Sequence, residues 1–233
     1  MALSVPLKTL ALDTSTLRGS VALLDGDSVL AELRLASLET HAARLLGSIR
    51  FLLQTAGWNL PDLALIAAGL GPGSFTGIRI GCATALGLAQ TLRVPFAGIS
   101  GLDALAFQHA ALGDRIGVIM DAQRGQVYYA EYASRNGRIR KTRAAALWFP
   151  AELKRRLPHR GVRFVGDGAG KYAEALGPAV RSWQVVDSQP FLAGPIGRLA
   201  LARRRLWRSG DALVCEPVYI RPPDARRPGG RKK

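Results

Sequence analysis

The sequence has few cysteines and few histidines. Its 233 residues include two cysteines, Cys82 and Cys215, and three histidines, His41, His109 and His159. No CxxC, HxxxH or HExxH spacing occurs among them. We therefore expect neither a disulfide framework nor a zinc knuckle, and no zinc or iron hydrolase centre.

The sequence also lacks a long apolar run. No stretch of 18 apolar residues occurs, which argues against a membrane-spanning helix. The first apolar stretch is interrupted by Pro6, Lys8 and Asp13, a pattern unlike that of a signal peptide. We therefore expect a cytoplasmic protein without membrane contact, long enough for one large domain or two small ones.

Acidic residues are scarce in the second part of the chain. Residues 1–133 hold 9 basic and 10 acidic side chains, whereas residues 134–233 hold 23 and 7. Essentially all of the net charge of +15 therefore comes from the second part. Such a local excess predicts a polyanionic partner, and nucleic acid is the one that we expect.

Hydrophobic periodicity predicts an α/β fold with two lobes. Strands are expected at residues 8–13, 20–24, 28–35, 63–70 and 96–99, and helices at 40–57, 75–92 and 100–111. A hairpin at 116–121 and 126–132, a mixed region at 144–185 and a basic helix at 196–207 follow. We expect an N-terminal lobe over residues 1–101, joined by a helix at about 190–210, a C-terminal lobe over 102–189, and a basic disordered tail over 221–233.

The segment GLGPGSFTGIRIG at residues 69–81 is the strongest local signal. A strand that passes through glycines and a hydroxyl residue into a helix exposes backbone N–H groups and is typical of an anion site. It is not a Walker loop, since no Gly-Lys-Ser/Thr follows, and the glycines could equally serve a tight turn. A GxSxG nucleophile elbow is also absent. The candidate residues near an anion or nucleotide are Asp13, Gly71, Gly73, Ser74, Thr76 and Arg79.

Small residues recur four apart along the helix expected at 75–92, which gives it one smooth face. That face could pack on the helix at 40–57 in the same lobe or on a helix of another subunit. The candidate partner interface consists of His41, Leu45, Ile49, Gly77, Gly81, Ala85 and Ala89.

Arginines cluster near the C-terminal end. They could form a solvated helix face or contact RNA phosphates. The candidates for tRNA contact are Arg203, Arg204, Arg205 and Arg208, together with Arg226, Arg227, Arg231, Lys232 and Lys233 in the tail.

Several segments together resemble one protein family. They are LALDTST at 10–16, THAARLL at 40–46, GPGSFTGIRIG at 71–81, ATALGLAQ at 83–90, DAQRGQVY at 121–128 and PVYIR at 217–221. These segments are similar to the TsaB (YeaZ) family, and they span nearly the whole chain.

The resemblance implies the two-lobed actin/hexokinase/Hsp70-like (ASKHA) fold and a role in forming threonylcarbamoyladenosine at position 37 of tRNA. It implies a heterodimer with the catalytic subunit TsaD, an ATPase partner TsaE, tRNA reached through the complex, and possible homodimers of the chain alone. ATP and Mg²⁺ are expected at the level of the complex, with no cofactor bound by this chain alone.

Two departures indicate a non-catalytic subunit. The superfamily's Asp-x-Gly phosphate loop lacks its glycine here, where Asp13 is followed by Thr14 and Ser15. The metal-binding histidines of TsaD-type proteins are absent from residues 100–104, which read SGLDA. The alternative is an ATPase or kinase of the same fold with its own nucleotide site. A metallopeptidase is disfavoured because its ligands are missing.

Overall fold

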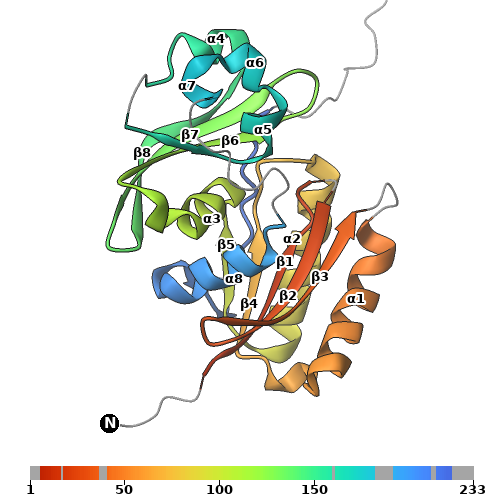
Figure 1. Cartoon of the computed structure of the whole chain (residues 1–233). Coiled ribbons are helices and arrows are strands. Elements are labelled where there is room, and N and C mark those ends of the chain that lie inside the picture. The colour runs from red at the N-terminus through yellow and green to blue at the C-terminus, as the bar shows by residue number, and fades with distance from the viewer. Residues whose placement is uncertain are drawn as a thin grey trace, which may run out of the picture.

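The computed structural model describes residues 6–16, 18–36, 41–158, 161–181, 191–210 and 214–221, and the structural statements below concern these residues. Figure 1 shows two sheets, one above the other, with helices between and around them.

The first sheet begins with three antiparallel strands, β1 (Lys8–Asp13), β2 (Arg18–Asp25) and β3 (Ser28–Ala36). β4 (Leu65–Gly69) and β5 (Phe96–Ile99) continue it in parallel beyond β1. The short β10 (Trp207–Arg208) closes the far edge, so the sheet order is β10-β5-β4-β1-β2-β3.

Helices cover both faces of this sheet (Figure 1). The helices α1 (His41–Ala56) and α2 (Phe75–Leu92) share a core with Leu10 and Leu12 of β1. On the other face, α8 (Ala193–Ala202) packs on β1 and β2, where the alternate residue Ala11 belongs to a second core. Both faces of β1 are therefore buried, which explains why its sequence is almost continuously apolar.

The second sheet repeats the topology of the first. The strands β6 (Arg115–Asp121), β7 (Val127–Arg135) and β8 (Arg138–Trp148) form an antiparallel meander, and β9 (Arg163–Val165) pairs in parallel with β6. The order β9-β6-β7-β8 corresponds to β4-β1-β2-β3. The strand-end acids Asp13 and Asp121 thus occupy equivalent positions in the two lobes.

Short helices complete the second lobe. They are α4 (Pro150–Lys154), α5 (Asp167–Lys171), α6 (Ala173–Leu176) and α7 (Pro178–Arg181). Between the lobes lies α3 (Gly101–Gln108), which packs on α8 and on the strands β6 and β8. Single 3-10 turns occur at Leu60–Asp62, Ala110–Leu112 and Arg204–Leu206.

Two expectations from the sequence need correction. The expected basic helix at 196–207 ends at Ala202, after which the chain turns and returns to the first sheet as β10. The sequence pattern missed the long edge strand β8, because its alternation mixes arginines with apolar residues. The expected tail lies outside the described residues, apart from Arg221.

The segment 214–221 runs back across both lobes. Val218 donates its backbone N–H to the Leu70 carbonyl at 2.8 Å, and the Arg221 guanidinium donates to the Gln126 side chain at 2.6 Å. Cys82 and Cys215 form a disulfide between α2 and this segment. The sequence predicted no disulfide framework, and this prediction was wrong for Cys82 and Cys215. These residues are 133 positions apart in the sequence, and they meet only because the segment 214–221 returns to α2.

Candidate functional site

The loop after β1 packs directly on the glycine-rich turn and the first turn of α2. The Ser74 backbone N–H donates to the Ser15 carbonyl at 2.6 Å, and the Thr14 hydroxyl donates to the Gly77 carbonyl at 2.7 Å. A Cβ atom on Gly73 would overlap the Ser15 carbonyl, and one on Gly77 would overlap that of Thr14. The glycines are therefore required by close contact between two segments of the chain itself.

This contact involves the backbone N–H groups at the start of α2, which are the groups that would bind an anion there. Ser74 is the N-cap of α2, and its hydroxyl accepts the Gly77 N–H at 3.2 Å. Asp13 is 1% exposed, and its carboxylate accepts the Ser15 N–H at 3.2 Å. Because the loop and the first turn of the helix are in direct contact, the N–H groups of Ser74 and Gly77 are already bound by acceptors within the chain.

The other predicted anion residues lie around this turn in different environments. Gly71 is buried, and its carbonyl accepts the Gly101 N–H at 2.8 Å. Thr76 and Arg79 are exposed. The Arg79 guanidinium lies 3.8 Å from the centre of the Phe75 ring and donates to the Tyr219 hydroxyl at 3.3 Å. Arg79 thus holds the segment 214–221 on α2.

The equivalent acid of the second lobe is also satisfied internally. The Asp121 carboxylate accepts the Lys171 ammonium at 2.6 Å, the Tyr172 hydroxyl at 3.1 Å and the Gln123 backbone N–H at 2.9 Å. The sequence placed Asp121 at the end of a hairpin strand. The hydrophobic pattern gave no sign that Lys171 and Tyr172, at the end of α5, would bind its carboxylate.

Asp167 lies beside Asp121, and folding changes the pKa of its carboxyl group. Its carboxylate accepts the backbone N–H groups of Asp121 at 3.0 Å and Gly168 at 2.9 Å. Burial raises the pKa of Asp167, the hydrogen bond from Asp121 N–H lowers it, and the neighbouring Asp121 charge raises it further. The net pKa lies above the ordinary aspartate value, so Asp167 is a carboxyl group that folding makes harder to ionise.

The small-residue face of α2 points inward. Leu45 and Ile49 of α1 and Ala85 and Ala89 of α2 are at most 3% exposed, and Gly77 and Gly81 are buried. A Cβ on Gly81 would overlap the Thr14 hydroxyl. These residues pack inside their own lobe, so they are not available to a partner in the folded chain. His41 begins α1, and its side chain lies outside the described residues.

The outward face of the same two helices is different. Leu46 and Phe51 of α1 are 62% and 56% exposed. Gly47 of α1 and Gly87 of α2 are exposed, and a Cβ on either would meet nothing within 4 Å. Within the lobe nothing requires these two helix glycines, although each costs about 1 kcal/mol relative to alanine.

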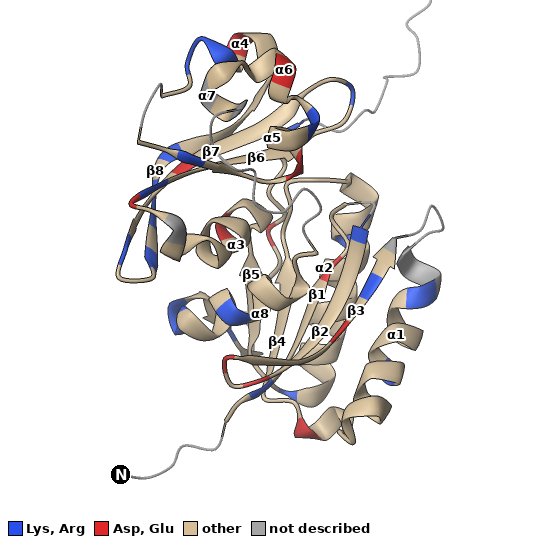
Figure 2. Cartoon of the chain, viewed as in Figure 1, with Lys and Arg blue, Asp and Glu red and all other residues tan. Residues whose placement is uncertain are grey.

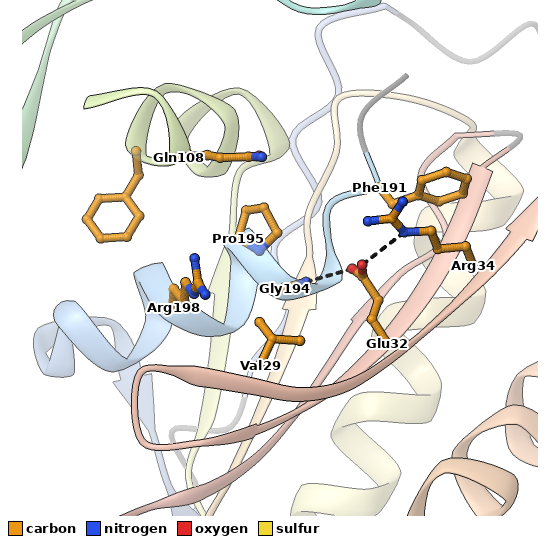
Figure 3. A pocket seen from close by; sticks show the side chains of 9 residues that line it. Val29, Glu32, Arg34, Gln108, Phe191, Gly194, Pro195 and Arg198 are labelled. Atoms are coloured by element: carbon orange, nitrogen blue, oxygen red, sulfur yellow. Dashed lines mark hydrogen bonds and ion pairs between the residues drawn. The ribbon is translucent and has the colours of Figure 1, made fainter. Parts of the chain in front are cut away.

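A cavity of about 430 Å³ opens beside the first turn of α8, lined by residues of β3, α3 and α8 (Figure 3). Its Glu32 carboxylate accepts the Gly194 N–H at 3.3 Å and the Arg34 guanidinium at 3.1 Å. Arg34 also stacks on the Phe191 ring, and Arg198 donates to the Asp27 carbonyl. The charged groups of the lining thus bind one another or the backbone, which gives this cavity no evident specificity.

The predicted tRNA-contacting arginines differ in environment. Arg204, Arg205 and Arg208 are exposed. Arg203 is instead a structural residue, because its guanidinium donates to the Ile139 carbonyl at 3.1 Å. The tail residues Arg226, Arg227, Arg231, Lys232 and Lys233 lie outside the described residues.

The described residues contain neither a metal-binding cluster nor a membrane-spanning helix. No group of three His, Cys, Asp or Glu side chains is arranged to hold a metal ion within that part of the chain. Within the same ranges, none of the helices has the length and apolarity needed to cross a membrane.

Two sheets of the same topology, with α3 and α8 between them, define a two-lobed α/β fold of the actin-like ASKHA class. The activator of the 2-hydroxyisocaproyl-CoA dehydratase from Clostridium difficile shares this fold at a TM-score of 0.53 and 12% identity, over 85% of this chain and 96% of that one. At that identity the likeness concerns the fold alone.

Other comparisons are more specific. Residues 34–160 match the family model described as TsaD: tRNA N6-adenosine threonylcarbamoyltransferase. The tRNA threonylcarbamoyladenosine biosynthesis protein TsaB of Escherichia coli is 36% identical over 221 residues, which cover 92% of this chain and 95% of that protein. YeaZ from Pseudomonas aeruginosa is 31% identical with a TM-score of 0.74, over 91% of this chain and 99% of that one. The chain belongs to the TsaB family of tRNA threonylcarbamoyladenosine biosynthesis proteins.

Proposed function

We propose that the chain is the non-catalytic partner of a TsaD-type threonylcarbamoyltransferase, and that the two act with a TsaE-type ATPase to form threonylcarbamoyladenosine at position 37 of tRNA. The observation that carries the proposal is the closed loop at Asp13. In a two-lobed fold, the strand-end loops are where a catalytic lobe would hold phosphate, and here Ser15 and Thr14 fill that position.

The same observation argues against an ATPase or kinase with its own nucleotide site. Asp121 is held by Lys171, Tyr172 and Gln123, so the equivalent loop of the second lobe is also occupied by the chain. ATP and Mg²⁺ then act at the level of the complex rather than on this chain alone. We further propose a cytoplasmic location and contact between the basic C-terminal half and tRNA in the complex.

We place the TsaD-type partner on the outward face of α1 and α2. Leu46 and Phe51 are large apolar side chains left exposed by the lobe. Gly47 and Gly87 leave room for the backbone of an approaching helix. Apolar and small residues of this kind are typical of permanent interfaces. A second copy of the chain could occupy this face when the partner is absent, which would give the homodimer.

Reconstitution tests the proposed function. A TsaD-type subunit, a TsaE-type ATPase, tRNA and threonylcarbamoyl-AMP are mixed with and without this chain, and modified adenosine is measured by mass spectrometry of tRNA digests. We expect modification only when the chain is present, and no turnover by the chain alone. Tight MgATP binding with hydrolysis by the isolated chain would instead support the ATPase.

Size-exclusion chromatography of the same mixtures tests the docking face. Leu46→Glu with Phe51→Glu should abolish the complex while the isolated variant stays folded, because both side chains are exposed. The matched control is Leu30→Glu, which alters another exposed leucine, on β3 (51% exposed). Complex formation by the double variant at the level of the control would place the partner elsewhere.

A further inference from the structure

The turn after α8 and the start of β8 form one basic surface that joins the two lobes. Figure 2 shows lysine and arginine residues at the lower end of β8 and at the neighbouring end of α8. Arg203 makes the link, because it donates to the carbonyl of Ile139 in β8. We call the exposed members of this group the arginine surface: Arg138, Arg140, Arg204, Arg205 and Arg208.

One partly buried acid organises the region beneath this surface. The Asp103 carboxylate of α3 accepts the Tyr132 hydroxyl at 2.7 Å and the Lys141 ammonium at 2.8 Å, and Arg203 lies 3.8 Å from its other oxygen. Asp103 is therefore committed to three groups from β7, β8 and the end of α8. It fixes the two halves of the arginine surface relative to each other.

The arginine surface itself remains uncompensated. Among the described residues, none of its five members forms an ion pair with an acidic side chain. Arg204 lies over the Trp207 ring at 5.4 Å, and Arg208 donates to the carbonyls of Arg205 and Trp207. Cations that lie near one another without acidic partners repel one another, which favours an anionic ligand.

We propose that the arginine surface binds the sugar-phosphate backbone of tRNA. Guanidinium groups bind phosphate oxygens in a bidentate manner. Arg138 and Arg140 are two residues apart on a regular part of β8, so they project from the same side about 7 Å apart. Such contacts position RNA without reading its sequence. The proposal rests on the proposed function, because tRNA is the substrate of the complex to which the chain is proposed to belong.

The proposal changes the residues expected from the sequence in two ways. It adds Arg138 and Arg140, which the sequence places more than 60 positions from the arginine cluster. It also makes Arg203 a positioning residue, since its guanidinium already binds Ile139 and approaches Asp103. The RNA would contact both lobes at once.

The test uses the full chain in its complex with the TsaD-type partner and a fluorescently labelled tRNA transcript. Affinity is measured by anisotropy between about 50 and 200 mM salt. We expect Arg138→Glu with Arg140→Glu to weaken binding about 10- to 100-fold at the lowest salt. The log–log slope of affinity against salt should fall by about two, one for each lost phosphate contact.

Two matched variants sharpen the result. Lys154→Glu with Arg155→Glu makes the same change in charge at exposed positions of α4 and its C-cap, and should leave affinity within about twofold of wild type, because they lie outside the arginine surface. Arg138→Lys with Arg140→Lys keeps the charges and should keep most of the salt slope. An equal loss in the α4 control, or an unchanged affinity and slope in the β8 variant, would overturn the proposal.

The outcomes also separate this proposal from the proposed function and from an anionic membrane. Phosphatidylcholine vesicles with and without phosphatidylglycerol are tested in parallel. Loss of vesicle binding by the β8 variant with unchanged tRNA binding would reject the RNA assignment. If wild-type chain forms no complex with the TsaD-type subunit, the proposed function fails, and the same variants measured on the chain alone still decide the arginine surface.

Discussion

Glycine serves two opposite purposes in this chain. Gly73 and Gly77 are needed because the loop after β1 lies so close that any side chain would overlap a carbonyl group. Gly47 and Gly87 lie in open space on the outside of their helices. The residue type is the same, but only the surroundings distinguish a glycine required for folding from one that the isolated lobe does not need.

Asp167 provides a pH-dependent prediction at the residue scale. Its pKa is raised in the folded chain, mainly by burial, so the folded state binds more protons than the unfolded state above the ordinary value of 3.8. The free energy of unfolding therefore decreases as pH rises from that value through the raised pKa. Asp167→Asn keeps an oxygen that can accept the N–H groups of Asp121 and Gly168, and it should remove this decrease.

Urea unfolding at a series of pH values between about 4 and 7 measures this effect. We expect the Asp167→Asn variant to be at least as stable as wild type at neutral pH. The control is Asp25→Asn, which changes an exposed carboxylate at the end of β2. Stability curves for wild type and Asp167→Asn that stay parallel across this range would contradict the prediction.

At the scale of elements, each of the two helices α1 and α2 has two distinct faces. The periodicity of the sequence identifies both helices and the small-residue face of α2, but it does not say which neighbour that face contacts. The loop at Asp13 and the sheet cover the inner face of α2. Because Gly81 and Ala85 are buried there, Gly81→Leu and Ala85→Arg should destabilise the fold itself and would not test binding of the partner alone. The outer face therefore carries the proposed docking role.

The outer glycines give opposite predictions for stability and binding. Gly47→Ala with Gly87→Ala should raise the unfolding free energy of the isolated chain by about 0.5–1 kcal/mol for each substitution, because alanine favours the helix. The same variant should bind the TsaD-type subunit at least several-fold more weakly, because the added methyl groups keep the partner helix at a distance.

Thermal unfolding and a binding titration with the TsaD-type subunit measure the two effects. Ala151→Gly provides the control, since this exposed alanine lies in α4, away from α1 and α2, and its replacement should lower stability without changing binding. A glycine variant that is more stable and binds as tightly as wild type would remove the glycines from the interface.

At the scale of the whole molecule, one apolar core cluster extends through both lobes, and a few polar links join them in addition. Asp103 connects α3 to β7, β8 and the end of α8. The segment 214–221 adds a second connection, from Leu70 in the first lobe to Gln126 in the second. Basic residues of the second part of the chain lie on both lobes (Figure 2).

Removing the Asp103 carboxylate should therefore weaken the whole fold. Asp103→Ala leaves the hydroxyl of Tyr132, which is 1% exposed, without its acceptor. We expect a loss of about 1–3 kcal/mol in the free energy of unfolding. Asp103→Asn keeps an acceptor for Tyr132 and should lose less. Chemical denaturation measures both variants, and equal stability of Asp103→Ala and wild type would contradict the role of this link.

The sequence by itself determined the fold class, the family and the elements of the first lobe from β1 to β5, because apolar periodicity and the 71–81 segment depend on neighbours close along the chain. The order of α1, β4, α2 and β5 follows from such local signals. The bias of charge toward the second part is likewise a property of composition and needs no coordinates.

Only the tertiary structure decided which residues meet. It closed the loop at Asp13 against Ser74, joined Cys82 to Cys215 and placed Arg138 beside the end of α8. It also placed the small-residue face of α2 against the interior of its own lobe. Each of these outcomes is a contact between segments far apart in sequence. The patterns that predict helices and strands come from adjacent residues, so they contain no information about such contacts.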